Sequence, residues 1–245
     1  MKHALVVGGT GGIGSRLVER LCADGDDVVF TYFRARSDAE ALAKRLADQG
    51  HRATPVRADI SRPRALEPAV EACGPAIDIV MVAAASGVWG PLAGMRRRHV
   101  EWAFEVNATA LVELFSLVLP RMRDVAGSMV VLTSLGGARV IPHYAGIGMS
   151  KAAAETFVRY AAAEAGPDGV RVNAVAPGLV LTKALRAAPE LAAEADRVIA
   201  ATPLGRLTTP DDVCDVALWL TSKGASMVTG QVLVVDGGHA GAGYT

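Results

Sequence analysis

The segment Gly8-Gly9-Thr10-Gly11-Gly12-Ile13-Gly14 joins a β-branched run at 3–8 to a stretch of helical period at 12–24. Glycine lets the backbone turn tightly and approach a pyrophosphate, whose charge is attracted by the free amides of a helix N-terminus. In this strand–turn–helix context the cluster predicts a dinucleotide site. The alternative is a tight turn without a ligand. We expect the cofactor contacts of this segment to come from Gly8, Thr10, Gly12, Ile13 and Gly14.

The same alternation of strand and helix patterns continues along the chain and is typical of parallel strands joined by crossover helices. The predicted strands are 3–8, 27–32, 53–58, 78–83, 128–133, 170–175 and 232–235, and the predicted helices are 12–24, 38–49, 63–73, 98–124, 148–165 and 211–221. We therefore predict one doubly wound, Rossmann-type α/β domain over 1–245. Its seven-stranded parallel sheet has helices on both faces and ligands at the carboxyl ends of its strands. Residues 183–209 interrupt the rhythm and are expected to form a short substrate lid.

Composition narrows the class of protein. The 245 residues are 51% hydrophobic, which is enough for a large core and excludes a mainly disordered protein. Twenty-five basic residues balance 25 acidic ones, so neither a nucleic acid nor an anionic membrane is predicted as a partner.

The cysteines and the apolar runs bear on location. Cys22, Cys73 and Cys214 form no CxxC pair, and no cluster has metal-ligand spacing, so neither a disulfide framework nor a metal site is predicted. The run 4–7 is too short for a signal peptide, and no run approaches the roughly 20 apolar residues of a membrane span. We expect a cytoplasmic protein.

The end of the second predicted strand bears on cofactor choice. An acid at this position binds the ribose 2′-hydroxyl of NAD, whereas arginine accommodates the 2′-phosphate of NADP. The sequence reads Thr31-Tyr32-Phe33-Arg34-Ala35-Arg36 and contains no acid. We therefore expect NADPH, with Arg34 and Arg36 at its 2′-phosphate. The alternative is that both arginines solvate a surface loop.

Over nearly its full length the chain resembles the short-chain dehydrogenase/reductases. The motifs that carry the resemblance are Gly8-x3-Gly12-Ile13-Gly14, Ala58-Asp59-Ile60, Val82-Ala83-Ala84-Ala85-Ser86-Gly87, Pro177-Gly178-x3-Thr182 and Val234-Val235-Asp236-Gly237-Gly238. Two departures are Val7, where a threonine is usual, and the alanines that replace both asparagines of an Asn-Asn-Ala-Gly stretch. The resemblance implies a homotetramer and cofactor contacts from Asp59, Ile60, Ala84, Lys151, Pro177, Gly178 and Thr182.

The predicted active-site helix departs from the family's Tyr-x3-Lys pattern. Lys151 matches the lysine, but Ile147 occupies the tyrosine position, and the nearest tyrosine, Tyr144, gives Tyr-x6-Lys. Asn107 and Ser134 match the family's helix asparagine and strand-end serine. Ser134 lies only ten residues before Tyr144. This spacing resembles the type III bacterial enoyl-[acyl-carrier-protein] reductases, which are themselves similar to short-chain reductases.

Enoyl reduction gives a chemical reason for the displaced tyrosine. Hydride goes to the β-carbon of a conjugated thioester, and negative charge develops on the thioester oxygen two bonds further away. Moving the tyrosine by three residues, nearly one helical turn of about 5.4 Å, carries its hydroxyl toward that oxygen. We expect Tyr144 to stabilise or protonate the enolate and Lys151 to hold the nicotinamide ribose. The alternative for Tyr144 is that it only packs at a helix start, and the alternative for Lys151 is that it is an exposed residue of a helix.

The roles of three neighbouring residues stay open. Ser134 is expected to donate to the substrate carbonyl or to Tyr144, or else it begins a polar turn. Asn107 either holds a water, caps a backbone irregularity near Lys151, or is purely structural. His143 is not predicted to act as the general acid.

The resulting prediction is an NADPH-dependent reductase of an enoyl thioester carried by acyl carrier protein or coenzyme A. One alternative is a 3-oxoacyl or other carbonyl reductase that uses Tyr144 despite its spacing. Another is a catalytically silent dinucleotide-binding protein, suggested by Ile147 and the missing asparagines. The basic run Arg96-Arg97-Arg98-His99 either attracts an acidic carrier or is a solvated helix start.

Overall fold

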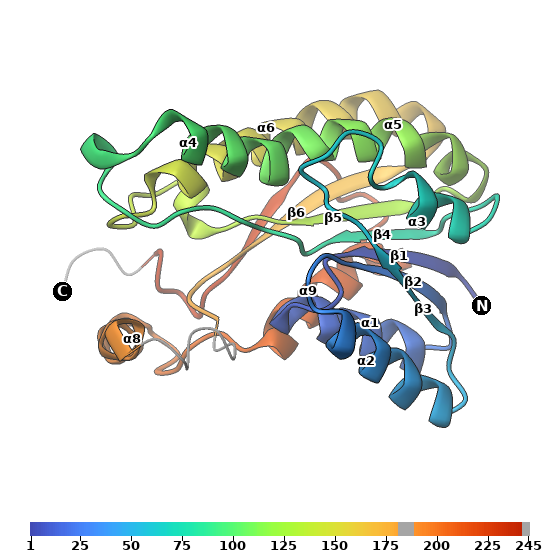
Figure 1. Cartoon of the computed structure of the whole chain (residues 1–245), viewed down its shortest axis with the longest axis horizontal. Helices are drawn as coiled ribbons and strands as arrows, with labels where there is room; N and C mark the ends of the chain where they lie inside the picture. The colour runs from blue at the N-terminus through green and yellow to red at the C-terminus, as the bar shows by residue number, and fades with distance from the viewer. Residues whose placement is uncertain (181–188, 242–245) are drawn as a thin grey trace.

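The computed structural model describes residues 1–180 and 189–241, without the side chains of 189–193. Seven parallel strands form one sheet in the order β3-β2-β1-β4-β5-β6-β7 (Figure 1). Their bounds are β1 His3–Val7, β2 Asp27–Tyr32, β3 Ala53–Arg57, β4 Ile79–Val82, β5 Ser128–Leu132, β6 Arg171–Pro177 and β7 Val232–Val235. The predicted Rossmann-type sheet is confirmed, and its strand order reverses beside β1, which creates the ligand crevice of such folds.

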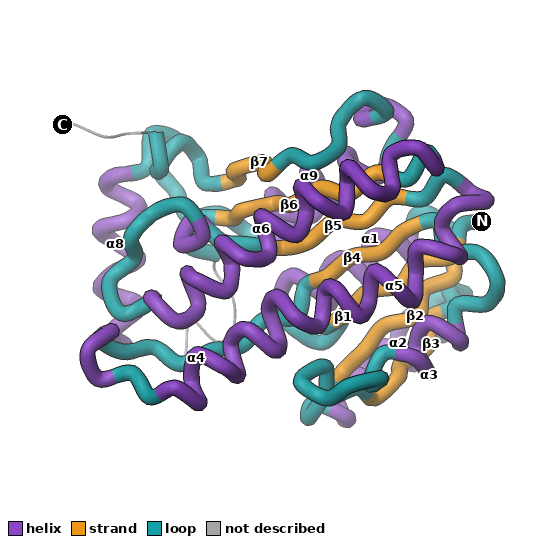
Figure 2. The backbone as a smooth tube through the Cα atoms, turned by 90° about the horizontal axis from the view of Figure 1, so that it is seen from above, coloured by secondary structure: helices purple, strands orange, loops and turns teal. Residues whose placement is uncertain are grey.

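Helices cover both faces of the sheet, as Figure 1 shows. One face carries α1 Gly12–Ala23, α2 Arg36–Asp48 and α9 Pro210–Thr221, and the other carries α3 Glu67–Ala72, α5 Ala110–Met122 and α6 Ala145–Ala165. Two further helices, α4 Arg97–Phe104 and α8 Pro189–Ala201, lie toward the carboxyl ends of the strands (Figure 2). These two helices are additional to the helices that cover the two faces of the sheet, and they flank the carboxyl ends of its strands.

Burial on both faces explains the strand sequences. In β1, Ala4 and Val6 belong to the core cluster under α1 and α2, while Leu5 and Val7 belong to the cluster under α5 and α6. All four side chains are buried. A strand buried on both faces needs an unbroken apolar run, which is why β1 contains no polar alternation.

The long helix predicted over 98–124 is interrupted. Its helical stretch consists of α4, a π-helical turn Glu105–Thr109 and α5. The turn contains Asn107, whose side chain hydrogen-bonds to the backbone of Ser86 in the loop after β4. A side chain anchored outside the helix accounts for the irregularity, because single π-helical turns commonly place one residue for a specific contact.

Two other helix boundaries differ from the prediction. The helix predicted over 63–73 begins only at Glu67, because Arg64 has a left-handed φ of 63° that ordinary helix excludes. The helix predicted from 148 begins at Ala145, so Tyr144 occupies its N-cap. Tyr144 and Lys151 are therefore carried by one rigid element.

Among the residues that the structure describes, one helical stretch is long and apolar enough to cross a bilayer by length and composition. It spans Arg97–Val125, and half of its most apolar window is buried inside the protein. Leu111, Leu114 and Val118 of this stretch belong to the core. Buried core helices pass the same test, and α5 is such a helix.

The described part of the predicted lid is attached to the last strand's end. Residues 181–188 lie outside the described residues, whereas α8 and the turn after it are described. The Leu204 amide donates to the Gly237 carbonyl at 3.2 Å, and a Cβ on Gly237 would lie 2.7 Å from Thr202 Cγ2. The segment after α8 thus packs on the turn after β7. Substrate closure by 183–209 stays a prediction.

The turn between β1 and α1 leaves no room for side chains at two glycines. Gly8 has a φ of +87°, which favours glycine, and a Cβ on Gly14 would lie 2.1 Å from the Gly8 carbonyl oxygen. Such a separation is far inside van der Waals contact, and the neighbouring atoms are backbone that cannot rotate away. The start of α1 is therefore held directly against the end of β1.

This packing predicts the effect of a single methyl group. Gly14→Ala is expected to lower the free energy of unfolding by about 1–3 kcal/mol, because the backbone must shift to admit the Cβ. Urea denaturation followed by circular dichroism measures the change. Gly166→Ala is the control, since no atom lies within 4 Å of a Cβ there. Equal stabilities for Gly14→Ala and the wild-type protein would contradict the packing.

Candidate active site

The glycine turn forms a backbone-lined cradle. Gly8 N donates to Thr31 Oγ1 at 3.0 Å and Gly9 N donates to Thr31 O at 2.8 Å, which ties the turn to β2. A Cβ on Gly8 would lie 2.6 Å from Ala84 N, so the loop after β4 lies against the same turn. The structure thus brings together the predicted residues Gly8, Thr10, Gly12, Ile13, Gly14 and Ala84. Thr31 was missed, although its position at the end of β2 is a usable signal.

The N-terminus of α1 is open to an anion. Its N-cap is Gly11, and no described side chain caps the helix. Uncapped amides at a helix N-terminus, next to glycines with no side chains, suit a pyrophosphate. The cradle therefore fits a dinucleotide in both shape and charge.

Arginines gather where β2 ends. The Arg34 guanidinium lies 5.1 Å from the centroid of the Phe33 ring, and Arg36 pairs with Glu40 at 2.7 Å. Arg57, which the sequence analysis missed, ends β3 beside Tyr32 and donates from Nε to the Phe33 carbonyl at 3.4 Å. The sheet order, with β3 next to β2, was the signal that would have found it.

Asp59 and Ile60 lie in the turn after β3. The Asp59 carboxylate accepts hydrogen bonds from Ser61 N at 3.2 Å and from Ser61 Oγ at 2.7 Å. Arg62 lies 3.8 Å from the same carboxylate, and Ile60 packs on the core. Asp59 thus shapes the turn itself, and its expected contact with the adenine stays a prediction.

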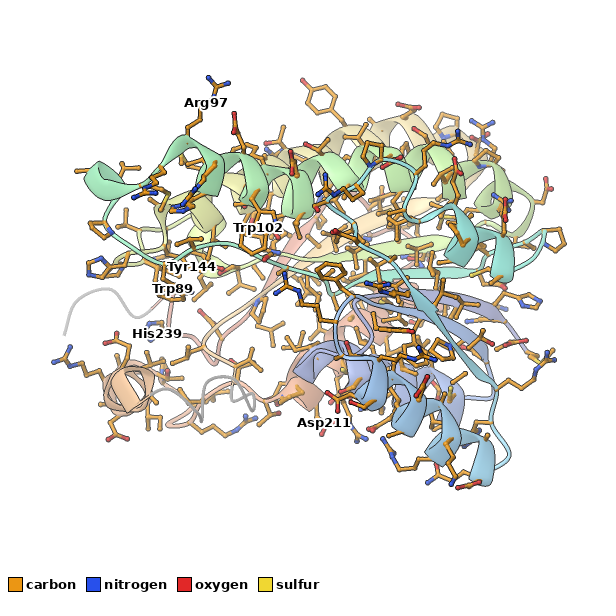
Figure 3. All side chains as sticks on the ribbon, viewed as in Figure 1. Trp89, Arg97, Trp102, Tyr144, Asp211 and His239 are labelled. Atoms are coloured by element: carbon orange, nitrogen blue, oxygen red, sulfur yellow. The ribbon has the colours of Figure 1, made fainter. Side chains whose placement is uncertain are left out.

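Tyr144 lies in a space made by glycines. A Cβ on Gly136 would lie 2.5 Å from the Tyr144 ring, and the Trp89 ring meets it edge to face with centroids 5.0 Å apart. Burial raises the pKa of Tyr144, and a hydrogen bond with the Ser134 side chain opposes that rise. Its phenol is therefore protonated at neutral pH and available as a donor. Figure 3 shows Tyr144 and Trp89 together at the carboxyl end of the sheet.

Ser134 lies two residues after the end of β5 and connects the strand to the Tyr144 region. Its Oγ accepts from Gly136 N at 3.2 Å, which fixes the short turn Leu135–Gly137. The same side chain lies close enough to Tyr144 to lower the pKa of its phenol. The structure thus brings together the two residues whose pairing the sequence left open.

Lys151 carries a charge into the protein interior. Its side chain is buried, and Nζ donates to the Leu132 carbonyl at 2.8 Å. Burial lowers the pKa of Lys151 to about 8, while Glu155 one turn later opposes the shift. The ammonium form therefore predominates at pH 7. Its only described hydrogen-bond acceptor is that carbonyl, which leaves ammonium protons for a ligand.

Asn107 connects the loop after β4 to α6. Oδ1 accepts from Ser86 N at 3.0 Å, and Nδ2 donates to Ser86 O at 2.7 Å and to Ser150 Oγ at 2.9 Å. Ser150 donates in turn to the Ile147 carbonyl at 2.7 Å. Asn107 therefore positions the helix directly before Lys151. Ser150 was missed, because a serine within a helix gives no local sign of a buried partner.

Ile147 occupies the usual tyrosine position with an apolar side chain. It is 6% exposed, and a Cβ on Gly87 would lie 2.2 Å from Ile147 Cγ1. The side chain therefore packs tightly against the loop after β4. It offers no hydroxyl, so the described tyrosine that contacts Ser134 is Tyr144.

The last two strands end side by side. Pro177 ends β6, Gly178 N donates to Val235 O at 2.9 Å, and a Cβ on Gly178 would lie 3.0 Å from Asp236 Cβ. Thr182 lies outside the described residues. Among the described residues, no group of three or more His, Cys, Asp or Glu side chains could hold a metal ion.

Comparisons with known proteins agree with this geometry. The family model described as Enoyl-(Acyl carrier protein) reductase matches residues 8–240. The chain belongs to the short-chain dehydrogenase/reductase family. It is 31% identical to the 1-cyclohexenylcarbonyl-CoA reductase of Streptomyces collinus, over 96% of this chain and 85% of that one. It is 32% identical to the 7alpha-hydroxysteroid dehydrogenase of Escherichia coli K12, over 97% and 93%.

A solved structure adds a cofactor-bound neighbour. BdcA in complex with NADPH superposes with a TM-score of 0.87 at 29% identity, covering 96% of this chain and 93% of BdcA. Short-chain dehydrogenase/reductases are oxidoreductases that use NAD or NADP. The glycine cradle, the open end of α1 and the buried Lys151 ammonium fit such a cofactor, and they supply the backbone amides and the cation that it requires.

The buried lysine predicts a pH-dependent stability. The folded pKa of about 8 lies below the ordinary 10.5, so the folded state loses its proton first. The cost of burying the charge is therefore complete below pH 8 and is relieved as the pH rises toward 10.5. Relative to Lys151→Met, the wild-type protein should gain about 2 kcal/mol of unfolding free energy between pH 7 and 9.5.

Chemical denaturation at a series of pH values measures this difference. Lys44→Met, which replaces an exposed lysine of α2, is the control and should leave the pH dependence unchanged. A constant difference between wild type and Lys151→Met over the whole range would show that Lys151 titrates normally.

Proposed function

We propose that this protein is an NADPH-dependent reductase that saturates the carbon–carbon double bond of an enoyl thioester. The observation that carries the proposal is that the tyrosine stands at the N-cap of α6 and an isoleucine stands at the usual tyrosine position. Tyr144, at the helix N-cap, lies against Gly136 and near Ser134, whose side chain lowers the pKa of the phenol. Ile147 fills the usual tyrosine position with an apolar side chain. The available phenol therefore lies about one helical turn before the place that direct carbonyl protonation uses in this family.

The chemistry divides among three side chains. NADPH, when bound, would supply a hydride to the β-carbon of the enoyl group, and the π electrons of the double bond would shift toward the thioester oxygen. Tyr144 stabilises the resulting enolate by donating its O–H, and Ser134 orients the phenol. The α-carbon of the enolate then takes a proton from water, giving the saturated thioester and hydroxide. The Lys151 ammonium is expected to hold the ribose hydroxyls and to favour negative charge nearby.

The comparisons support the proposal in part. The matching family model is described as an enoyl reductase, and the Streptomyces relative is named for reduction of a cyclohexenylcarbonyl thioester. The steroid dehydrogenase relative favours carbonyl chemistry instead. Carbonyl reduction is therefore the second candidate, and the contact of Ser134 with Tyr144 serves it equally well.

The preference for NADPH rests on charge at the end of β2. Three guanidiniums, Arg34, Arg36 and Arg57, belong to this region, and Arg34 has no described ion-pair partner. A 2′-phosphate suits such a cluster, since arginine presents forked donors to phosphate oxygens. The NADPH complex of BdcA is consistent with this choice. The carrier of the acyl group, the cytoplasmic location and the homotetramer stay predictions.

Removing the phenol tests the proposed role of Tyr144. Tyr144→Phe should lower the turnover of crotonyl thioester by about two to four orders of magnitude, because the enolate loses its donor. NADPH oxidation at 340 nm measures the rate, and acetoacetyl thioester is assayed in parallel. Tyr160→Phe is the matched control, since that tyrosine is 75% exposed on the same helix. Unchanged activity in Tyr144→Phe would exclude the role, and robust turnover of the ketone alone would favour carbonyl reduction.

Neutralising the arginines tests the cofactor preference. The double change Arg34→Ala and Arg36→Ala should raise the KM for NADPH at least tenfold and leave the KM for NADH nearly unchanged. Of the single changes, Arg34→Ala should have the larger effect, because Glu40 already pairs with Arg36. Arg52→Ala, at the opposite end of the sheet, is the control. Equal losses with both cofactors would contradict the 2′-phosphate assignment.

A further inference from the structure

A cavity of about 430 Å³ lies between the loop after β5 and the turn after β7. Its described lining consists of Leu135, Arg139, Val140, Ile141, His239 and Ala240. Four of these side chains are apolar, and the other two can donate hydrogen bonds. The cavity thus suits a ligand with an apolar body and a polar end.

The cavity adjoins the proposed catalytic tyrosine. Ile141 lines the cavity, and Gly136, next to the lining residue Leu135, would place a Cβ 3.3 Å from Ile141 Cδ1 and 2.5 Å from the Tyr144 ring. Gly136 thus lies against both the Tyr144 ring and the cavity residue Ile141. Figure 3 shows His239 at the same end of the sheet as Tyr144 and Trp89.

His239 lines the cavity and contains an unpartnered polar atom. Its Nδ1 is buried and has no hydrogen-bond partner among the described residues. The backbone that carries it is fixed, because Asp236 accepts from Gly238 N at 2.9 Å and from Ala240 N at 2.6 Å. Buried polar atoms are almost always hydrogen-bonded, so an orphan held on a rigid turn indicates an external partner.

Arg139 supplies positive charge to the same space. Its backbone amide donates to Leu135 O at 2.9 Å, which fixes the residue on the cavity loop. Within the described residues its guanidinium forms no salt bridge. A guanidinium without a carboxylate partner, beside an imidazole N–H, matches the two oxygens of a carboxylate or a phosphate.

We infer that this cavity binds an oxyanion at the end of an apolar portion of the substrate, with the Arg139 guanidinium and the His239 imidazole as its hydrogen-bond donors. The apolar lining accommodates the chain, and the cation and the imidazole fix its end. Two parts of a thioester have this chemistry, the far carboxylate of an acyl chain and the phosphate of a pantetheine arm. The inference rests on the proposed function for the identity of the molecule, and the binding itself requires no turnover.

Equilibrium binding tests the site. Hexanoate, hexanol and 4′-phosphopantetheine are titrated into the full-length protein, with binding followed by the NMR signals of ¹⁵N-labelled histidine. Hexanoate should bind about ten times more tightly than hexanol and should shift the His239 Nδ1 signal. Arg139→Gln should abolish this preference and leave hexanol binding unchanged. The conservative change Arg139→Lys should restore part of it, since a charge remains without the fork.

Controls separate the outcomes. Arg52→Gln removes an exposed arginine at the other end of the sheet and should bind like wild type. Tighter binding of phosphopantetheine than of hexanoate assigns the site to the carrier arm, and the reverse order assigns it to the acyl end. Equal affinities for hexanoate and hexanol in the wild-type protein would overturn the inference. Failure of enoyl turnover with the anion preference intact would refute the proposed function and leave the site standing.

Discussion

The burial of the Lys151 ammonium is the constraint around which this site is organised. A charged group this deep costs free energy unless its environment compensates, and the described compensation is the Leu132 carbonyl at 2.8 Å and the nearby Glu155 carboxylate. The position of α6 must therefore be fixed closely. Asn107 and Ser150 provide this by connecting the start of the helix to the loop after β4. The π-helical turn that contains Asn107 is the local distortion that accompanies this contact.

The placement of Tyr144 follows from glycines. Gly136 leaves the space that its ring occupies, and Gly87 leaves the space that Ile147 occupies. With Ile147 packed against the loop after β4, the phenol that contacts Ser134 comes from the N-cap of α6. The chemistry of the site therefore depends on which side chains the backbone admits, as well as on which reactive groups are present.

Much of the fold could be predicted because its determinants are local. Apolar runs of strand length, joined by stretches of helical period, indicated all seven strands within about two residues. The interruption at 105–109 could not be predicted, since it depends on the contact of Asn107 with Ser86, 21 residues away. The late start of α3 follows from the left-handed backbone of Arg64, which has no sequence signal of the kind that glycine gives.

The candidate site could likewise be predicted only in part. Motif spacing indicated Tyr144, Lys151 and Ser134, and the structure places them around the end of β5. Arg57, Ser150 and His239 depend on which strands and turns become neighbours in space, so a linear pattern could not single them out.

Enoyl and carbonyl reduction differ in which substrate carbon receives the hydride. Equimolar crotonyl and acetoacetyl thioesters, incubated with NADPH deuterated at the transferable position, test this directly by NMR of the products. The account predicts deuterium at the β-carbon of butyryl thioester, whereas deuterium on the carbinol carbon of 3-hydroxybutyryl thioester, with crotonyl thioester unreacted, would contradict it.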